Sequence, residues 1–319
     1  MNLMALLADR VAAGKPVRVG LIGAGKFGSM FLSQVPTIAG LDVVAIADLD
    51  PDRARQACKT VGWPDDLIAA TQFHDNGTDL TRQPGIEVVI EATGSPTAGI
   101  AHALNAIEFG KHIVMVSVEA DVLAGPALAA RARQAGLVYS MAYGDQPALV
   151  AEMVDWARAS GFTVMAAGKG TKYLPAYHNA TPDEVWDNFG ISPQDAQAAG
   201  MNPQMFNSFM DGTKSAIEMV AIANACDLKV PKAGLKFPPC GVDDLSHILR
   251  PESAGGVLEG PGMVEVVSSL ERDGRPVFRD LRWGVYVVIE APNDYAAACL
   301  KQYGLQTDAT GRYAAMYKP

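Results

Sequence analysis

The feature that most constrains the fold is a glycine-rich turn near the amino terminus. Gly23, Gly25 and Gly28 form the pattern G-x-G-x-x-G between the apolar stretch 17–22 and the amphipathic stretch 26–35. In a strand–turn–helix unit, the first glycine permits the tight turn, the second lets a pyrophosphate approach the backbone, and the third lets the helix pack on the strand. The pattern predicts a dinucleotide-binding turn with the pyrophosphate at the helix N-terminus. The alternative is an ordinary strand–helix turn without a ligand.

An acidic residue downstream supports this interpretation. The stretch 41–50 reads as a second buried strand that ends at Asp48, 20 residues after Gly28, where a ribose-binding carboxylate is expected. Asp48 would accept a hydrogen bond from a free ribose 2′-hydroxyl, which favours NAD. Arg53 and Arg55 follow on the next turn and can neutralise the 2′-phosphate of NADP, or they are solvated helix residues. The residues leave the choice between NAD and NADP open.

The alternation of strands and helices continues and predicts a doubly wound parallel sheet, the Rossmann-type α/β class. The expected elements are a strand and turn at 85–96, a helix at 98–109, a strand at 110–120, a helix at 125–134 and a strand at 136–147.

Ligands bind at the carboxyl ends of parallel strands, so the loop "EATGSP" is expected to flank the nicotinamide. Thr93 in this loop is interpreted as a cofactor contact or a helix cap, and Glu119 as a helix cap. The predicted cofactor-binding set also includes Gly94, beside Thr93, and Lys26 and Phe27 within the glycine motif.

The regular alternation ends near Pro147, which predicts two domains. These are a dinucleotide-binding domain over 1–147 and an α+β substrate and dimerisation domain over 148–319. The second domain is expected to contain a helix at 148–160, a strand at 162–170, an irregular span at 171–204, one long helix at 205–226, and strands within 266–291 joined by a turn at Asp273-Gly274.

Lysines distinguish the second half. Six lysines and no arginine occur from Lys169 to Lys236. Lys169 and Lys172 lie in "GKGTK" after a predicted strand, where a compact cation suits phosphate oxygens or a carbonyl. Lys214 and Glu218 are four residues apart on a predicted helix and form either a surface ion pair or an acid/base pair. The candidate catalytic residues are therefore Lys169, Lys172, Lys214 and Glu218.

Composition excludes several classes of protein. The net charge of −9 argues against nucleic acid as a main partner, and no apolar run is long enough to span a membrane. Four scattered cysteines indicate a reducing compartment, so a cytoplasmic protein is expected. Neither the cysteines nor the histidines have metal-ligand spacing, and the residues predict no metal site.

Several segments together resemble the homoserine-dehydrogenase-like oxidoreductases and, more closely, their 1-deoxy-D-xylulose 5-phosphate reductoisomerase-like branch. The segments are "GLIGAGKFGSMFLSQ", "VVAIADLDPDRA", "IEATGSPTAG", "GKHIVMVSVEADVLAGP" and "DGTKSAIEMVAIANACDL". The resemblance covers nearly the whole chain. It implies NADPH-dependent conversion of 1-deoxy-D-xylulose 5-phosphate to 2-C-methyl-D-erythritol 4-phosphate, a step of isoprenoid precursor synthesis. It also implies a homodimer, a divalent metal whose ligands the sequence does not place, and a carboxyl-terminal SAF-type domain that these residues do not include.

The chain departs from true homoserine dehydrogenases at their catalytic positions. Val118-Glu119 stand where those enzymes have Asn-Lys, and Lys214 and Glu218 stand where they have Asp and Lys. A lysine repels the ammonium group of homoserine and attracts an anionic or phosphorylated substrate. Two alternatives stay open, a dehydrogenase of another small hydroxy or phospho-sugar substrate and a non-enzymatic dinucleotide sensor.

Overall fold

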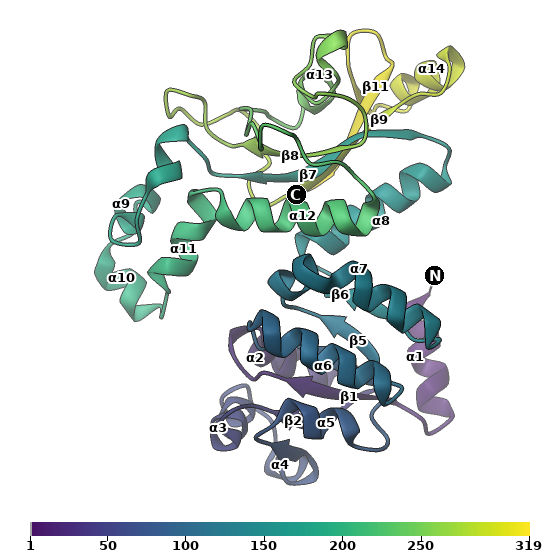
Figure 1. Ribbon diagram of the computed structural model, residues 1–319, viewed down its shortest axis with the longest axis vertical. Coiled ribbons are helices and arrows are strands. Elements are labelled where there is room, and N and C mark those ends of the chain that lie inside the picture. Colours follow the sequence, from purple (N-terminus) through teal and green to yellow (C-terminus); the bar gives the residue numbers. More distant parts are fainter. Residues whose placement is uncertain (1) are drawn as a thin grey trace. The chain divides into compact units, whose positions relative to one another are not determined.

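The computed structural model describes residues 2–319, which form two compact units joined between Ala142 and Tyr143 (Figure 1). Unit 1 extends to Ala142 and unit 2 begins at Tyr143. The boundary expected from the sequence, at Pro147, lies slightly later. Each unit contains its own sheet, so each is described separately.

Unit 1 is built on a parallel six-stranded sheet of order β3-β2-β1-β4-β5-β6. Short apolar runs form its central strands, and the last four residues of β1 are all buried. The strands are β1 (Val17–Ile22), β2 (Leu41–Ala47), β3 (Gln72–His74), β4 (Val88–Glu91), β5 (His112–Met115) and β6 (Tyr139–Met141). The predicted doubly wound parallel sheet is confirmed.

Helices cover both faces of this sheet (Figure 1). Leu32 of α2 and Ala54 and Cys58 of α3 pack with Leu21 on one face. On the other face, α5, α6 and α7 contribute Leu80, Ala103 and Leu128. The helices are α1 (Leu3–Ala12), α2 (Lys26–Gln34), α3 (Pro51–Thr60), α4 (Asp65–Ala70), α5 (Gly77–Arg82), α6 (Pro96–Glu108) and α7 (Val118–Gln134), with a 3-10 turn at Val35–Thr37.

The predicted start of α7 at Gly125 is wrong, because the helix begins at Val118. The hydroxyl of Ser117 caps it by accepting a hydrogen bond from the Ala120 N–H at 3.3 Å. Glu119 lies in the first turn and is therefore not the cap residue. Gly125 and Pro126 lie inside the helix. Because glycine and proline are common at helix ends, they predicted a helix start at this point that the structure does not have.

Unit 2 contains a mixed five-stranded sheet of order β10-β11-β9-β7-β8. The strands are β7 (Thr163–Thr171), β8 (Met263–Ser268), β9 (Val285–Glu290), β10 (Gln306–Thr307) and β11 (Tyr313–Lys318). β7 lies between β8, which is parallel to it, and β9, which is antiparallel. The predicted turn at Asp273-Gly274 is present, with Gly274 at φ +88°, but the strands on either side of it are not neighbours.

Two hydrophobic layers enclose this sheet. Met153 of α8 and Met219 of α12 pack on one face, and Leu245 of α13 packs on the other, where fully buried Tyr286 also lies. The helices are α8 (Gln146–Ala159), α9 (Val185–Phe189), α10 (Pro193–Ala198), α11 (Pro203–Met210), α12 (Thr213–Cys226), α13 (Leu245–Ile248) and α14 (Asp294–Gln302), with 3-10 turns at Pro175–Asn179 and Glu252–Ala254.

The single helix predicted over 205–226 is wrong, because the chain turns between α11 and α12. Gly212 takes a left-handed conformation with φ +91°, which glycine adopts without steric cost. The carboxylate of Asp211 accepts a hydrogen bond from the Thr213 N–H at 2.8 Å and supports the start of α12. Apolar periodicity continues across this break, so the pattern alone did not reveal it.

Two glycines on either side of Lys169 let β7 fit between β8 and β9 in the sheet. A Cβ on Gly168 would lie 1.9 Å from the Glu265 carbonyl oxygen, and one on Gly170 would lie 2.0 Å from that of Leu281. These glycines therefore make room for neighbouring backbone.

Replacing Gly168 with alanine should lower the free energy of unfolding by about 1–3 kcal/mol, because the added methyl group overpacks the sheet. Gly260→Ala is the matched control, since a Cβ at Gly260 meets nothing within 4 Å. Urea unfolding followed by circular dichroism measures both. Equal stability of the two variants would contradict the close approach seen at β7.

Candidate functional site

A cavity of about 480 Å³ opens at the carboxyl ends of β1, β2 and β4 in unit 1. The lining comes from the turns that follow these strands and from the start of α5 and α6. The lining residues that matter below are Gly23, Gly25, Asp48, Arg53, Thr93 and His102. This is the edge at which open parallel sheets bind ligands.

The glycine turn has the geometry that a dinucleotide needs. Gly23 takes φ +98°, and a Cβ on it would lie 2.6 Å from the Ala92 carbonyl oxygen. A Cβ on Gly28 would lie 2.3 Å from the Gly23 carbonyl oxygen, so α2 packs closely on the turn. Gly25 lines the cavity, and a Cβ there would meet nothing within 4 Å. The bare backbone at Gly25 therefore leaves open space for a diphosphate at the start of α2.

Asp48 is held as an anion at the edge of the cavity. Its carboxylate accepts hydrogen bonds from the Ala24 N–H at 2.9 Å and the Asp50 N–H at 3.2 Å. It also forms an ion pair with the Arg53 guanidinium at 2.5 Å. Burial opposes ionisation, but these donors outweigh it and lower the pKa of Asp48. The side chain of Arg53 is 62% exposed against 3% for Asp48, so the arginine covers the carboxylate from the solvent side.

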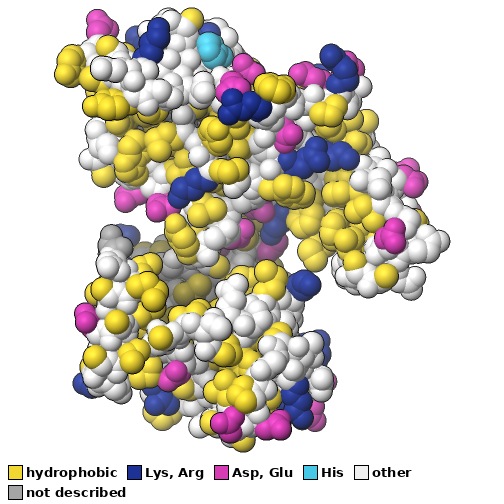
Figure 2. Space-filling view, turned by 180° about the vertical axis from the view of Figure 1, so that it is seen from behind, with side chains coloured by type: hydrophobic (Ala, Val, Ile, Leu, Met, Phe, Trp, Pro, Cys, Tyr) yellow, Lys and Arg dark blue, Asp and Glu magenta, His cyan; other side chains and the backbone are white. Residues whose placement is uncertain are grey.

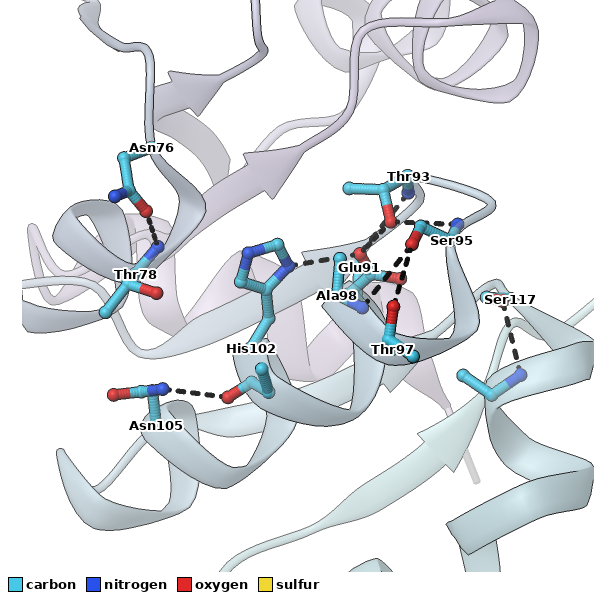
Figure 3. A network of polar contacts seen from close by, with 12 residues as sticks. Asn76, Thr78, Glu91, Thr93, Ser95, Thr97, Ala98, His102, Asn105 and Ser117 are labelled. Atoms are coloured by element: carbon cyan, nitrogen blue, oxygen red, sulfur yellow. Dashed lines mark hydrogen bonds and ion pairs between the residues drawn. The ribbon is translucent and has the colours of Figure 1, made fainter.

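A second carboxylate organises the loop after β4 (Figure 3). Glu91 is fully buried, and its Oε1 accepts a hydrogen bond from the Thr93 hydroxyl at 2.6 Å. The Nδ1 atom of His102 lies 3.3 Å from the same oxygen. Figure 3 shows Thr93 and His102 on opposite sides of this carboxylate, so Glu91 connects the loop to α6. The hydroxyl of Ser95 caps α6 beside them.

The cavity combines predicted and unpredicted residues. Gly23, Gly25, Asp48, Arg53 and Thr93 line it, whereas four residues of the predicted set do not, namely Lys26, Phe27, Gly28 and Gly94. Sequence reasoning missed Asn76, Ser95 and His102 in the lining. The one available signal was Glu91, an ionisable residue at the end of an otherwise apolar strand.

In unit 2, the structure brings together Lys169 of β7 and Glu218 of α12. The Nζ atom of Lys169 forms a short ion pair with Glu218 and donates a hydrogen bond to Gln146 Oε1 at 2.8 Å. Lys169 is 7% exposed and Glu218 is 5% exposed. A buried pair of this kind is stable only while both partners are present.

The Glu218 carboxyl has an altered proton affinity. Burial raises its pKa, while the positive charges of Lys169 and Lys214 and the hydrogen bond from Lys169 oppose the rise. The negative charge of Asp145 raises it further. Three charged groups, from β7, α12 and the N-cap of α8, thus act on the Glu218 carboxyl, which is an arrangement able to hold and transfer a proton.

Lys172 takes other partners. Its ammonium donates a hydrogen bond to the Asn188 carbonyl at 2.7 Å and lies 5.7 Å from the centre of the Phe189 ring. Burial, together with the charge of Arg282, lowers its pKa. Lys172 therefore contacts α9, whereas Lys169 contacts Glu218 of α12 and Gln146 of α8.

Among residues 2–319, no group of three or more His, Cys, Asp or Glu side chains is arranged to hold a metal ion. In the same described part of the chain, no helix is both long and apolar enough to cross a membrane.

Two family models match the chain and divide it between them. Residues 17–143 match the oxidoreductase family with an NAD-binding Rossmann fold. Residues 144–319 match the catalytic domain of oxidoreductase DRL.

Several characterised proteins are similar over shorter segments. Inositol 2-dehydrogenase of Acidothermus cellulolyticus is 36% identical over 121 residues, which are 36% of this chain and 32% of that protein. Homoserine dehydrogenase of Pseudomonas aeruginosa is 31% identical over 133 residues, 39% of this chain and 28% of that protein. The chain thus matches about a third or less of the length of these relatives. The crystal structure of a homoserine dehydrogenase from Thiobacillus denitrificans covers 67% of this chain and 50% of its own, with 21% identity and a TM-score of 0.48.

The buried pair predicts strong coupling between two substitutions. Lys169→Met alone leaves the Glu218 carboxylate without its partner and should lower the free energy of unfolding by about 3–5 kcal/mol. The double variant Lys169→Met with Glu218→Leu should lose much less, because an apolar pair needs no compensation. Urea unfolding of wild type, both single variants and the double variant completes the cycle. Additive losses would show that the two side chains do not interact.

Proposed function

The chain belongs to the family of oxidoreductase DRL, and we propose from this premise that it is an NAD(P)-dependent oxidoreductase of a small hydroxy or carbonyl compound. The proposal assigns dinucleotide binding to unit 1 and substrate binding with proton transfer to unit 2. The observation that supports it most directly is the cavity at the glycine turn, where Gly25 leaves the backbone open.

The residues of unit 1 suit a dinucleotide. Backbone N–H groups at the start of α2 would donate hydrogen bonds to the pyrophosphate, and the anionic carboxylate of Asp48 would accept one from a ribose hydroxyl. When bound, the dinucleotide supplies or receives the hydride. Thr93, fixed by Glu91, would hold the loop after β4 in place against it.

The cofactor preference follows from the pair of Asp48 and Arg53. Free Asp48 would repel a 2′-phosphate, but Arg53 is largely exposed and can move from the carboxylate to a phosphate while backbone N–H groups keep Asp48 in place. We therefore propose that the site accepts NADPH as well as NADH. The resemblance to reductoisomerases favours NADPH.

The residues of unit 2 suit a substrate that exchanges a proton. Glu218, with its raised pKa, would move the proton of a hydroxyl or enol group, and Lys169 would compensate its charge. Lys214 would stabilise negative charge on an oxygen of the substrate. The proposed substrate class is therefore a small anionic hydroxy or carbonyl compound.

The finer hypotheses differ in substrate. The resemblance stated above implies 1-deoxy-D-xylulose 5-phosphate, whereas the partial relatives are named as dehydrogenases of inositol and homoserine. A panel of these compounds with NADH and NADPH distinguishes them. Binding of a dinucleotide without turnover of any compound would favour the sensor alternative.

Replacing Gly25 with valine should weaken NADH and NADPH binding at least tenfold, because the new side chain enters the cavity. Gly25 has φ −72°, so the backbone tolerates a side chain and the fold should persist. Quenching of dinucleotide fluorescence measures the affinities, and Gly260→Val is the control. Unchanged binding would remove the glycine turn from the cofactor site.

Replacing Lys214 with methionine should reduce turnover at least tenfold with the best substrate of the panel and leave dinucleotide binding unchanged, since the lysine is assigned to the substrate. Lys301→Met, on the surface of α14, is the matched control. Initial rates of dinucleotide oxidation measure the effect. Wild-type rates in Lys214→Met would exclude this lysine from the reaction.

A further inference from the structure

A groove in unit 2 has no part in the proposed function, and we propose that it binds a small organic cation with an apolar body. The groove lies between α12, the segment after β7 and the loop at 230–237, and it has a volume of about 810 Å³. Lys169 and Glu218 are not among its lining residues, because Met219 and Val220 turn a different face of α12 toward it.

The groove is apolar along most of its length. Ala216, Met219, Val220, Val230 and Leu235 line it. Ala216 is exposed and Val230 is 52% exposed, so this surface is in contact with water when the groove is empty. Figure 2 shows apolar side chains spread widely over unit 2, so apolar exposure alone does not identify a ligand site. The specific features are an aromatic wall and a single carboxylate.

The aromatic wall consists of Tyr173 and Phe237. Their rings stack with centres 4.0 Å apart and an angle of 23° between their planes. Both residues are more than nine-tenths buried and both line the groove. Aromatic faces attract cations, so a wall of this kind suits a cationic ligand.

The backbone of Phe237 has a strained conformation that neighbouring hydrogen bonds stabilise. Its φ of +48° lies in the left-handed region, which is costly for a bulky residue. The buried carboxylate of Glu265 fixes this conformation by accepting hydrogen bonds from the N–H groups of Phe237 at 3.3 Å and of Lys236 at 3.0 and 3.1 Å. Burial raises the pKa of Glu265, and these N–H donors oppose the rise. Strain that is held by dedicated contacts is typical of ligand sites.

The charge of the groove determines the class of ligand. Asp211 is the one carboxylate among the lining residues of the described chain, and no lysine or arginine joins it there. One of its oxygens accepts a hydrogen bond from the Thr213 N–H and the other from the Asn207 amide at 3.1 Å. A carboxylate accepts about four hydrogen bonds, so Asp211 retains capacity for a ligand. An ammonium group is the ligand group that both a carboxylate and an aromatic face attract.

Three probes of similar shape and different charge test this proposal, namely 2-phenylethylamine, 2-phenylethanol and 3-phenylpropanoate. The amine should bind at least tenfold more tightly than the alcohol, and the acid should not bind. Isothermal titration calorimetry of the full chain measures the affinities without any dinucleotide or turnover. The result is therefore independent of the proposed function. Equal affinities, or preference for the acid, would overturn the proposal.

Two variants locate the site. Ala216→Trp should fill the groove and weaken binding of the amine at least tenfold, whereas Ala298→Trp on the surface of α14 should leave it unchanged. Asp211→Asn should abolish the preference for the amine over the alcohol. Circular dichroism establishes that each variant is folded. If the amine binds Ala216→Trp as tightly as wild type, the groove is not a cation site. The same conclusion follows if no probe binds wild type and Ala216→Trp changes only the oligomeric state measured by sedimentation.

Discussion

The pairing of two buried charges constrains how the elements of unit 2 pack. Lys169 on β7 and Glu218 on α12 are both buried, and each would be strongly unfavourable without the other. Their contact therefore fixes how α12 is rotated about its axis relative to β7. It also places Gln146, at the start of α8, beside the same ammonium group. Gly168 and Gly170 make this arrangement possible, because side chains there would separate β7 from the backbone around it.

The parts of the molecule that sequence predicted best are those whose components lie close together along the chain. In unit 1, the glycine turn joins a strand directly to its helix, and Asp48 follows at the end of the next strand. Adjacent parallel strands of this kind bring their carboxyl ends together at one edge. The order of these residues along the chain therefore predicts which of them lie together at the cavity. Asp48 contacts Ala24 in the preceding strand–helix turn and Arg53 five residues later, so both contacts follow from the order of these elements along the chain.

Features that depend on long-range pairing were not predictable from pattern. β8 and β9 are joined through a turn but flank β7, because sheet order depends on which strands pair rather than on their order in the chain. His102 is only 11 residues from Glu91, but it reaches that carboxylate because α6 packs back on the sheet beside β4, which the residue pattern does not show. The break at Gly212 was hidden for a different reason. Apolar residues on α11 and α12 keep a helical period across it, and the conformation of one glycine decides the outcome.

The lysine-rich segment shows why proximity in sequence does not establish a cationic pocket. Lys169 is neutralised by Glu218, Lys172 binds a backbone carbonyl of α9, and Lys236 pairs with Glu252. A lysine that already compensates a buried carboxylate contributes little attraction for a further anion. In the proposed mechanism Lys214 is assigned to the anionic substrate, and its positive charge also acts on Glu218. The number of lysines in the segment is irrelevant to that attraction, because their partners determine how much charge remains available.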